Sequence, residues 1–246
     1  MTAGMTSGHE QAMTSVVIDP VHRGPSRSGN GGWTAGVLAG YVPGDGPVTV
    51  TLRRPPPLAR PLEVRLVDDV AVLLDGSELV AEAEPAGAVP EPVRPVGADE
   101  AQAVEARYAG LAAHPFPECF ACGTERAEGD GLVLRPGPVG PGRTACTWVP
   151  QPSHVEPPHL WAALDCPGGW TNDLRGRPMV LGRITAVVRR RPRPGERLVV
   201  VGALLDATAR KSVTATTVYD TAGSRIGSEI GSAVHTWIQV DPLAFA

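Results

Sequence analysis

The two halves of this chain resemble each other, and this internal repeat constrains the fold more than any other feature. The tetrapeptide GGWT occurs at residues 31–34 and again at 168–171, at an offset of 137. Residues 52–64 (LRRPPPLARPLEV) match 188–200 (VRRRPRPGERLVV) at an offset of 136, and 75–83 (DGSELVAEA) match 222–230 (AGSRIGSEI) at 147. Three matches in one order predict a duplicated domain of about 100 residues per copy. The alternative is chance similarity between two β-rich halves with proline-containing turns.

Each half is predicted to combine one helix with several short strands. The 26 Pro and 29 Gly against 3 Phe and 3 Tyr favour strands and turns over a helical bundle. Small residues and a possible N-cap at Asn30 predict a helix over 33–41, a second helix covers 157–170, and 99–112 forms a connecting helix that Asp99 could cap. Predicted strands cover 15–18, 48–52, 62–66, 71–74, 79–83, 131–134, 144–148, 183–188, 197–205, 212–219 and 226–240, with an Asp75-Gly76 turn between two of them.

These elements predict four regions. Residues 1–14 are polar and expected to be disordered, 15–84 form the first domain, 85–115 form a linker with a helix, and 116–246 form the second domain. No apolar run approaches about 18 residues, so no membrane span is expected. The absence of a secretory signal predicts a cytoplasmic protein with reduced cysteines. The net charge of −4 gives no reason to expect binding to nucleic acid.

Several stretches resemble the hotdog fold, and more narrowly the double-hotdog acyl-CoA thioesterases of the thioesterase II kind. These are NGGW (30–33) followed by TAGVLAG, Leu164-Asp165 within WAALDC, the Arg-Arg-Pro turns, and CFACGTERAEGDGL (119–132). The resemblance implies an α+β fold of two tandem hotdog domains, each a curved antiparallel sheet wrapped round a central helix. It also implies hydrolysis of an acyl-CoA or acyl-carrier thioester without a cofactor, and a possible homodimer of double hotdogs.

Asp165 is the leading catalytic candidate because it is the only charge in an apolar, small-residue segment. A buried carboxylate is costly unless it is paired or used. The resemblance implies that it activates water or attacks the thioester carbonyl. The alternative is a surface carboxylate beside a kink at Pro167. The GGWT register places Asp165 near the start of its helix and Ser28 at the equivalent position, which predicts one asymmetric site.

Backbone N–H groups at a helix N-terminus could receive the oxyanion of a thioester transition state. The candidates for this substrate contact are Asn30, Gly31, Gly32 and Trp33 in the first half, and Gly168 and Gly169 in the second. Simple capping and tight packing are the alternative roles for these residues.

Further candidates are weaker. The resemblance implies a polar residue that holds the attacking water, for which His235 and Ser232 on the last strand and Thr185 after the helix are considered. Each is also explained as an ordinary strand residue. Arg190 and Arg191, in the cluster 189–193, could bind coenzyme A phosphates, with Arg53 and Arg54 as first-half counterparts. The alternative, a solvated basic turn at the strand ends, is favoured for these arginines.

Cys119 and Cys122 have the spacing of metal ligands, but no second Cys-x-x-Cys follows. His154 and His159 would have to complete a zinc site across a long gap. Buried thiols are favoured instead, and no metal is expected. Cys166 has no adjacent histidine to activate it as a nucleophile.

Two other functions remain open at this point. The first is a hotdog module that binds an acyl thioester without hydrolysing it. The second is an enoyl-thioester hydratase or dehydratase. It ranks last because the paired Asp and His that the resemblance implies for such enzymes are missing at the expected spacing.

Overall fold

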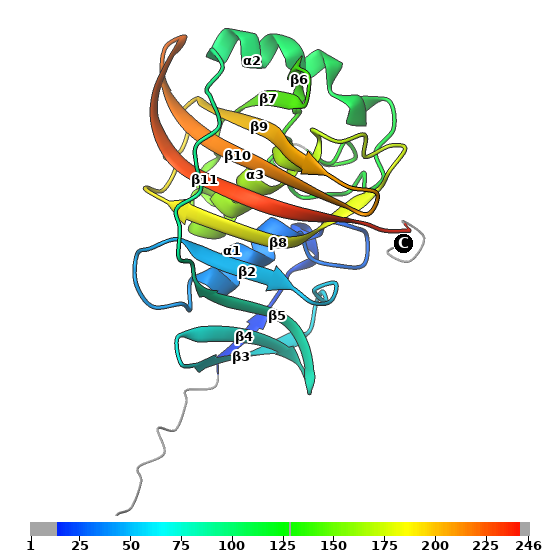
Figure 1. The fold of residues 1–246 in the computed structure, drawn as a ribbon, viewed down its shortest axis with the longest axis vertical. Helices are drawn as coiled ribbons and strands as arrows, with labels where there is room; N and C mark the ends of the chain where they lie inside the picture. Colours follow the sequence, from blue (N-terminus) through cyan, green and yellow to red (C-terminus); the bar gives the residue numbers. More distant parts are fainter. Residues whose placement is uncertain (1–13, 128, 242–246) are drawn as a thin grey trace, which may run out of the picture.

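One antiparallel sheet wraps around two helices (Figure 1). The computed structural model describes residues 14–127 and 129–241. Of the N-terminal segment predicted to be disordered, residues 1–13 therefore lie outside the described residues. Among the described residues the helices are α1 (Gly31–Ala39), α2 (Ala98–Val104) and α3 (Pro157–Gly169). The strands are β1 (Thr14–Val17), β2 (Val48–Leu52), β3 (Pro61–Val67), β4 (Val70–Asp75), β5 (Glu78–Pro85), β6 (Gly137–Gly140), β7 (Arg143–Trp148), β8 (Met179–Val188), β9 (Leu198–Ala207), β10 (Lys211–Ala222) and β11 (Arg225–Gln239).

The sheet is close to symmetric about its middle. Its order is β1-β3-β4-β5-β2-β8-β11-β10-β9-β7-β6, so β2 and β8 meet at the centre and equivalent strands follow on either side. Thr49 pairs with Thr185 in the β2–β8 ladder, and their hydroxyl oxygens are 2.8 Å apart. The offset between these two threonines is 136, the offset of the second repeat, and that repeat covers the passage from β2 to β3 and from β8 to β9. The third repeat covers the β4–β5 and β10–β11 hairpins.

The GGWT repeat does not follow this symmetry. Gly31 begins α1, whereas Gly169 ends α3, so the offset of 137 aligns the start of one helix with the end of the other. Glycine is suited to both places, because it permits close packing at a helix start and ends a helix readily. The placement of Asp165 near a helix start, opposite Ser28, was therefore wrong. Asp165 lies in the C-terminal part of α3, and Pro167 is inside the helix.

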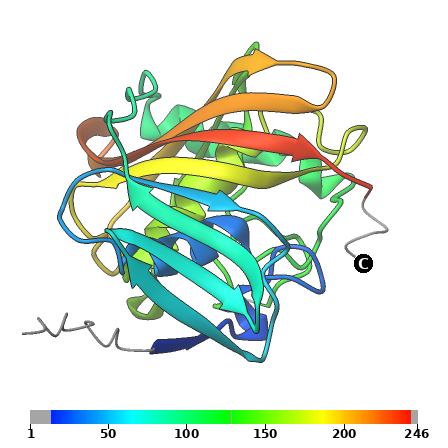
Figure 2. The same ribbon diagram turned by 60° about the horizontal axis from the view of Figure 1, so that its bottom comes forward.

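The two central helices pack antiparallel and very closely. A Cβ atom on Gly32 would lie 2.5 Å from Asp165 Cβ, and a Cβ on Gly36 would lie 2.7 Å from Pro158 Cα. Gly32 and Gly36 are one turn apart on α1, so they form one glycine face against α3. In α3 every residue from 159 to 169 is buried, which is typical of a helix that is apolar or small all round. Figures 1 and 2 show both helices on the same side of the sheet.

The predicted linker is an ordered strap across the outer face of the second half. Its Val93 N–H donates to Thr217 Oγ1 at 2.8 Å, and the Tyr219 hydroxyl donates to the Val93 carbonyl. The strap buries a second apolar cluster made of Val93, Val96, Ala98, Ala101, Val104, Ala145, Val199, Val201, Ala215 and Tyr219. The helix predicted at 99–112 is shorter than expected, because α2 gives way to 3₁₀ turns at 105–107 and 109–111. Gly97 is its N-cap, and Asp99 pairs with Arg197 instead.

The remaining differences from the predicted elements are local. The strand predicted at 131–134 is a loop, whose Leu132 and Leu134 N–H groups donate to the Phe120 and Ala121 carbonyls. The edge strand β6 was missed, because its sequence GPVG reads as a turn. Along the described part of the chain, no helix combines the length and the apolar character needed to cross a membrane.

Candidate functional site

A largely apolar cavity of about 210 Å³ opens where α1 begins and α3 ends. Side chains from three central strands form one wall of this cavity. These are Leu52 of β2, Met179 and Leu181 of β8, and Trp237 and Ile238 of β11. Asn30, Gly31 and Asp165 also line it, so an acidic group and a helix N-terminus face a largely apolar space. This composition suits an apolar ligand with one polar group.

Asp165 is the carboxylate of this cavity and is 2% exposed. Its Oδ2 accepts a hydrogen bond of 2.9 Å from the Gly32 N–H, so a residue of α3 binds the N-terminus of α1. Its Oδ1 is buried and has no partner among the described residues. Burial raises the pKa of Asp165 to about 8, and the nearby Cys119 adds to this, while the Gly32 N–H and the Asn30 side chain oppose it. Asp165 is therefore a carboxyl group that can exchange a proton near neutral pH.

The N-terminus of α1 leaves one backbone donor free at the cavity. Asn30 caps the helix, because its Oδ1 accepts from the Trp33 N–H at 2.8 Å. The Gly32 N–H is held by Asp165. The Gly31 N–H, at the first position of the helix, has no partner within the described residues, and Gly31 lines the cavity. Of the first-half candidates, Gly31 is thus the one whose N–H can bind a ligand oxygen.

The second glycine pair occupies a different position from the one predicted. Gly168 and Gly169 lie in the last turn of α3, where N–H groups point back into the helix rather than out of it. A Cβ on Gly168 would lie 2.7 Å from Thr216 Oγ1, and one on Gly169 would lie 2.6 Å from the Trp237 ring. These glycines let α3 approach the sheet and do not form a helix N-terminus.

The polar candidates on the strands lie away from the cavity. His235 is buried beneath α3, with Nδ1 3.2 Å from Thr214 Oγ1, and it does not line the cavity. Thr185 pairs with Thr49 at the sheet centre, on the same face as the exposed Arg183. The Ser232 hydroxyl lies 2.8 Å from Glu229 Oε1 and 3.3 Å from the carbonyl oxygen of Pro90 in the strap. Sequence alternation could not show which face of each strand is turned to the cavity.

The predicted phosphate-binding arginines are also outside the cavity. Arg190 forms ion pairs with Glu196 and Asp220, and Arg191 pairs with Glu156. Their first-half counterparts, Arg53 and Arg54, line the cavity and have side chains that are more than half exposed. The repeat gave the signal for this pair, since it aligned both arginine clusters.

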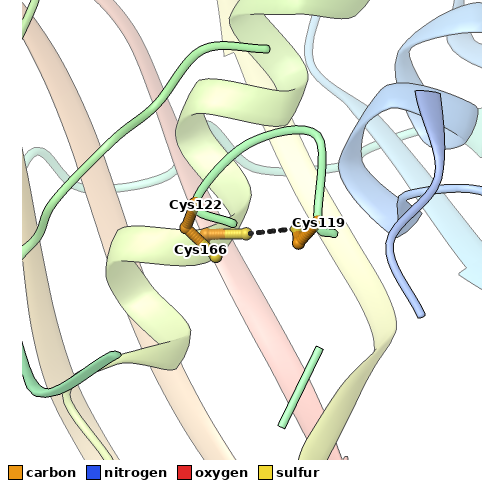
Figure 3. Close-up of side chains that lie close together, drawn as sticks. All are labelled: Cys119, Cys122 and Cys166. Atoms are coloured by element: carbon orange, nitrogen blue, oxygen red, sulfur yellow. Dashed lines mark hydrogen bonds between the residues drawn. The ribbon is translucent and has the colours of Figure 1, made fainter. Parts of the chain in front are cut away.

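Three cysteines meet beside Asp165 at the cavity (Figure 3). The Sγ atoms of Cys119, Cys122 and Cys166 lie within 4.8 Å of one another, and all three residues are buried. Hydrogen bonds from Cys122 and Cys166 lower the pKa of Cys119, whereas burial and the contact with Cys119 raise the pKa of Cys122. Sequence spacing missed the third member, Cys166, because α3 supplies it through the tertiary fold.

The histidines considered as partners for Cys119 and Cys122 form a separate aromatic cluster. The His154 and His159 ring centroids are 5.4 Å apart, and the His22 ring lies 5.9 Å from that of His159. His22 also stacks on Trp33 at 4.0 Å. Burial lowers the pKa of His22 and of His159 to about 4. These rings are therefore neutral packing groups at neutral pH.

His235 should make the fold sensitive to acid. Burial lowers its pKa to about 4, so between pH 6.5 and 4 the unfolded chain binds a proton there and the folded chain does not. The free energy of unfolding should fall by about 1.4 kcal/mol per pH unit from this group as pH drops through that range. Asp165, whose pKa is raised, changes stability in the opposite direction.

Denaturant unfolding of wild type and His235→Gln at pH 7 and pH 5 measures the contribution of His235. The variant should lose less stability between the two pH values than the wild type does. An equal loss in both proteins would contradict the assignment.

Comparison with known proteins identifies the fold of this chain but does not assign the chain to a family. No family model matches the chain, and no curated protein matches it significantly in sequence. Among solved structures, a conserved protein with a hot dog fold from Alicyclobacillus acidocaldarius is 13% identical, with 96% of each chain covered and a TM-score of 0.61. The tesB protein of Mycobacterium avium subspecies paratuberculosis is 12% identical, covers 94% of this chain and 96% of its own, and gives 0.60. An acyl-CoA thioesterase II from Mycobacterium marinum is 8% identical, covers 81% and 82%, and gives 0.50. The chain therefore has a hotdog fold.

Proposed function

We propose that this hotdog-fold chain is a tandem double hotdog that hydrolyses acyl thioesters at a single site built on Asp165. The symmetric strand order around β2 and β8, with one central helix in each half, supports the tandem arrangement. The similarity to a protein named as an acyl-CoA thioesterase supports the substrate class. The observation that carries the proposal is the buried, unpartnered Oδ1 of Asp165 at the wall of an apolar cavity.

The reaction follows from the groups around the cavity. The acyl chain occupies the apolar space, and the thioester carbonyl oxygen points to the free Gly31 N–H at the positive end of α1. Asp165 Oδ1 takes a proton from water as the water oxygen attacks the carbonyl carbon, and the oxyanion is stabilised by Gly31. The C–S bond then breaks, Asp165 returns the proton to the leaving sulfur, and the products are a carboxylic acid and a thiol.

The proposed site is asymmetric because only one central helix supplies a carboxylate. Helix α1 has the sequence GGWTAGVLA and contributes no acidic side chain. It contributes its N-terminus instead, which binds Asp165 and offers Gly31. One site is therefore assembled from both halves of the chain.

Release of free thiol from a panel of acyl-CoAs of increasing chain length tests the proposed activity. We expect turnover of at least one member above the uncatalysed rate. The acyl-binding alternative is supported by the raised pKa of Asp165, which leaves the carboxyl largely protonated at neutral pH. Thermal stabilisation by an acyl-CoA without thiol release, at pH 7 and at pH 9, would establish binding alone and overturn hydrolysis.

Arg53 and Arg54 should contribute to binding of the coenzyme A phosphates at the cavity mouth. Their side chains are exposed and line the cavity, although they also pair with Glu82 and Glu78. Arg53→Ala combined with Arg54→Ala should raise KM for acyl-CoA by roughly 10-fold with little change in kcat, because a charge-assisted contact contributes about 1.5–3 kcal/mol.

Arg191→Ala is the matched control for the arginine variants. Arg191 is exposed and paired with Glu156, as the cavity arginines are with their own glutamates, but it does not line the cavity. The control should leave KM unchanged. A larger effect of Arg191→Ala than of the double variant would move the phosphate site to the second half.

A further inference from the structure

The three cysteines beside the cavity form an arrangement suited to a metal ion. Cys119 and Cys122 come from one turn, and Cys166 comes from α3, so the cluster joins a loop to the central helix of the second half (Figure 3). The distance from Cys119 Sγ to Cys166 Sγ is 3.8 Å. Zinc–sulfur bonds of 2.3 Å at tetrahedral angles place two sulfur ligands about 3.8 Å apart. Cys119 and Cys166 are thus spaced as ligands of one ion, and Cys122 Sγ lies within 4.8 Å of both.

The turn that carries the first two cysteines is built to hold them together. The Gly123 N–H donates to the Cys119 carbonyl at 2.8 Å. A Cβ on Gly123 would lie 2.5 Å from that carbonyl oxygen and 2.5 Å from the Pro117 carbonyl oxygen. Glycine is therefore needed directly after Cys122, and the tight turn positions both sulfurs toward Cys166.

N–H donors surround the sulfurs. This observation is independent of the sulfur spacing, and it favours thiolates at these positions. The Trp170 indole Nε1–H donates to Cys122 Sγ at 3.3 Å, and the Asn30 amide donates to Cys119 Sγ at 3.6 Å. His114 Nε2 lies 3.4 Å from Cys122 Sγ. Hydrogen bonds of this kind stabilise negative charge on metal-bound sulfur.

His114 acts as one of these donors rather than as a fourth ligand. Its Nδ1 accepts the Phe116 N–H at 2.9 Å, so the neutral ring carries its proton on Nε2, the atom that faces Cys122. A metal ligand at Nε2 would need the opposite tautomer. All three cysteines line the cavity, which leaves the fourth coordination position to a water molecule or a ligand from that side.

We propose that Cys119, Cys122 and Cys166 bind one zinc ion through three thiolates, with the fourth position open to the cavity. Soft thiolate ligands select zinc among the common divalent ions. Binding displaces the thiol protons into solvent and ties the loop that carries Cys119 and Cys122 to α3. The ion would share the cavity with Asp165, and the metal titrations below detect it whether or not the chain hydrolyses thioesters.

Cobalt and zinc titrations of the reduced full-length protein test this site. Co²⁺ should produce a sulfur-to-metal charge-transfer band in the near ultraviolet, with an intensity typical of three thiolates and saturation at one ion per chain. Zn²⁺ should displace Co²⁺ and abolish the band, and native mass spectrometry should show one zinc. Absence of both the band and the zinc adduct would overturn the proposal.

Single substitutions assign the ligands. Cys166→Ser should reduce the intensity of the charge-transfer band to that of two thiolates, and it should weaken zinc binding strongly. Cys146→Ser is the matched control, because Cys146 is equally buried but lies on β7 outside the cluster, and it should leave the band unchanged. His114→Gln should keep three thiolates and lower zinc affinity by roughly 10–100-fold, as expected for a group that supports a ligand. The assignment would be contradicted if Cys146→Ser lost the band. It would also be contradicted if Cys166→Ser kept the full band while circular dichroism showed that the variant is folded.

Discussion

Asp165→Asn should lower acyl-CoA hydrolysis by about 10²–10⁴-fold while the protein remains folded. The amide has nearly the same shape and its oxygen can still accept from the Gly32 N–H, but it cannot take a proton from water. The burial that raises the pKa of Asp165 favours the neutral carboxyl group, so a neutral amide fits the same surroundings. Steady-state thiol release, together with a thermal unfolding curve, checks both parts of this expectation.

Asp173→Asn provides the control for this substitution. Asp173 lies just beyond α3, its side chain is 67% exposed, and its neighbour in the structure is Arg175 rather than a cavity residue. Its substitution should leave both rate and stability unchanged. Full hydrolysis by Asp165→Asn would remove Asp165 from the mechanism, whereas loss of fold in that variant would show that the carboxylate is structural.

Gly32→Ala should lower the free energy of unfolding by about 1–3 kcal/mol and reduce hydrolysis at the same time. The new Cβ would lie 2.5 Å from Asp165 Cβ and 2.6 Å from the Trp161 carbonyl oxygen, so α1 and α3 must separate. That separation moves the Gly32 N–H away from Asp165 and Gly31 away from the carboxylate. Denaturant unfolding and thiol release measure the two effects.

Two further glycine variants separate packing from chemistry. Gly36→Ala also forces the helices apart, near Pro158 and Trp161, one turn from the carboxylate. It should destabilise the protein similarly but retain more activity per folded molecule than Gly32→Ala. Gly46 has open space around it, and Gly46→Ala should change neither property. Equal activity of the Gly32 and Gly36 variants would show that the α1–Asp165 contact has no part in the reaction.

Local sequence signals predicted much of the secondary structure. The strand over 48–52 was predicted with the bounds of β2, and the helix after Asn30 was found with its cap, because capping and β-branched runs act over a few residues. The Asp75-Gly76 turn also holds, since Gly76 has a positive φ of 61°. The failures involve information that is not local. A four-residue repeat contains no sign of whether it starts or ends a helix, and β6 depends on pairing with β7.

The candidate site was predictable in part. Asp165 was found because an isolated acid in an apolar segment is conspicuous, and the structure places it at the cavity. The free Gly31 N–H could not be distinguished from that of Gly32 until the contact with Asp165 was visible. Whether the side chains of His235 and Thr185 reach the cavity depends on the face of the sheet on which each one lies, and the local sequence does not fix that face. Cys166 joins Cys119 and Cys122 only through the packing of α3 against a distant loop.

The pairing of β2 with β8 inside one chain has a consequence for how the sequence of this protein can evolve. In a dimer of identical subunits joined at such a central strand pair, every substitution would appear twice, once in each subunit. Here the two central strands, with the paired Thr49 and Thr185, belong to one polypeptide, so a substitution in one half appears only once. One helix can therefore specialise in presenting its N-terminus while the other specialises in supplying an acid. In the proposed double hotdog, the covalent link thus allows the two halves of a symmetric scaffold to diverge.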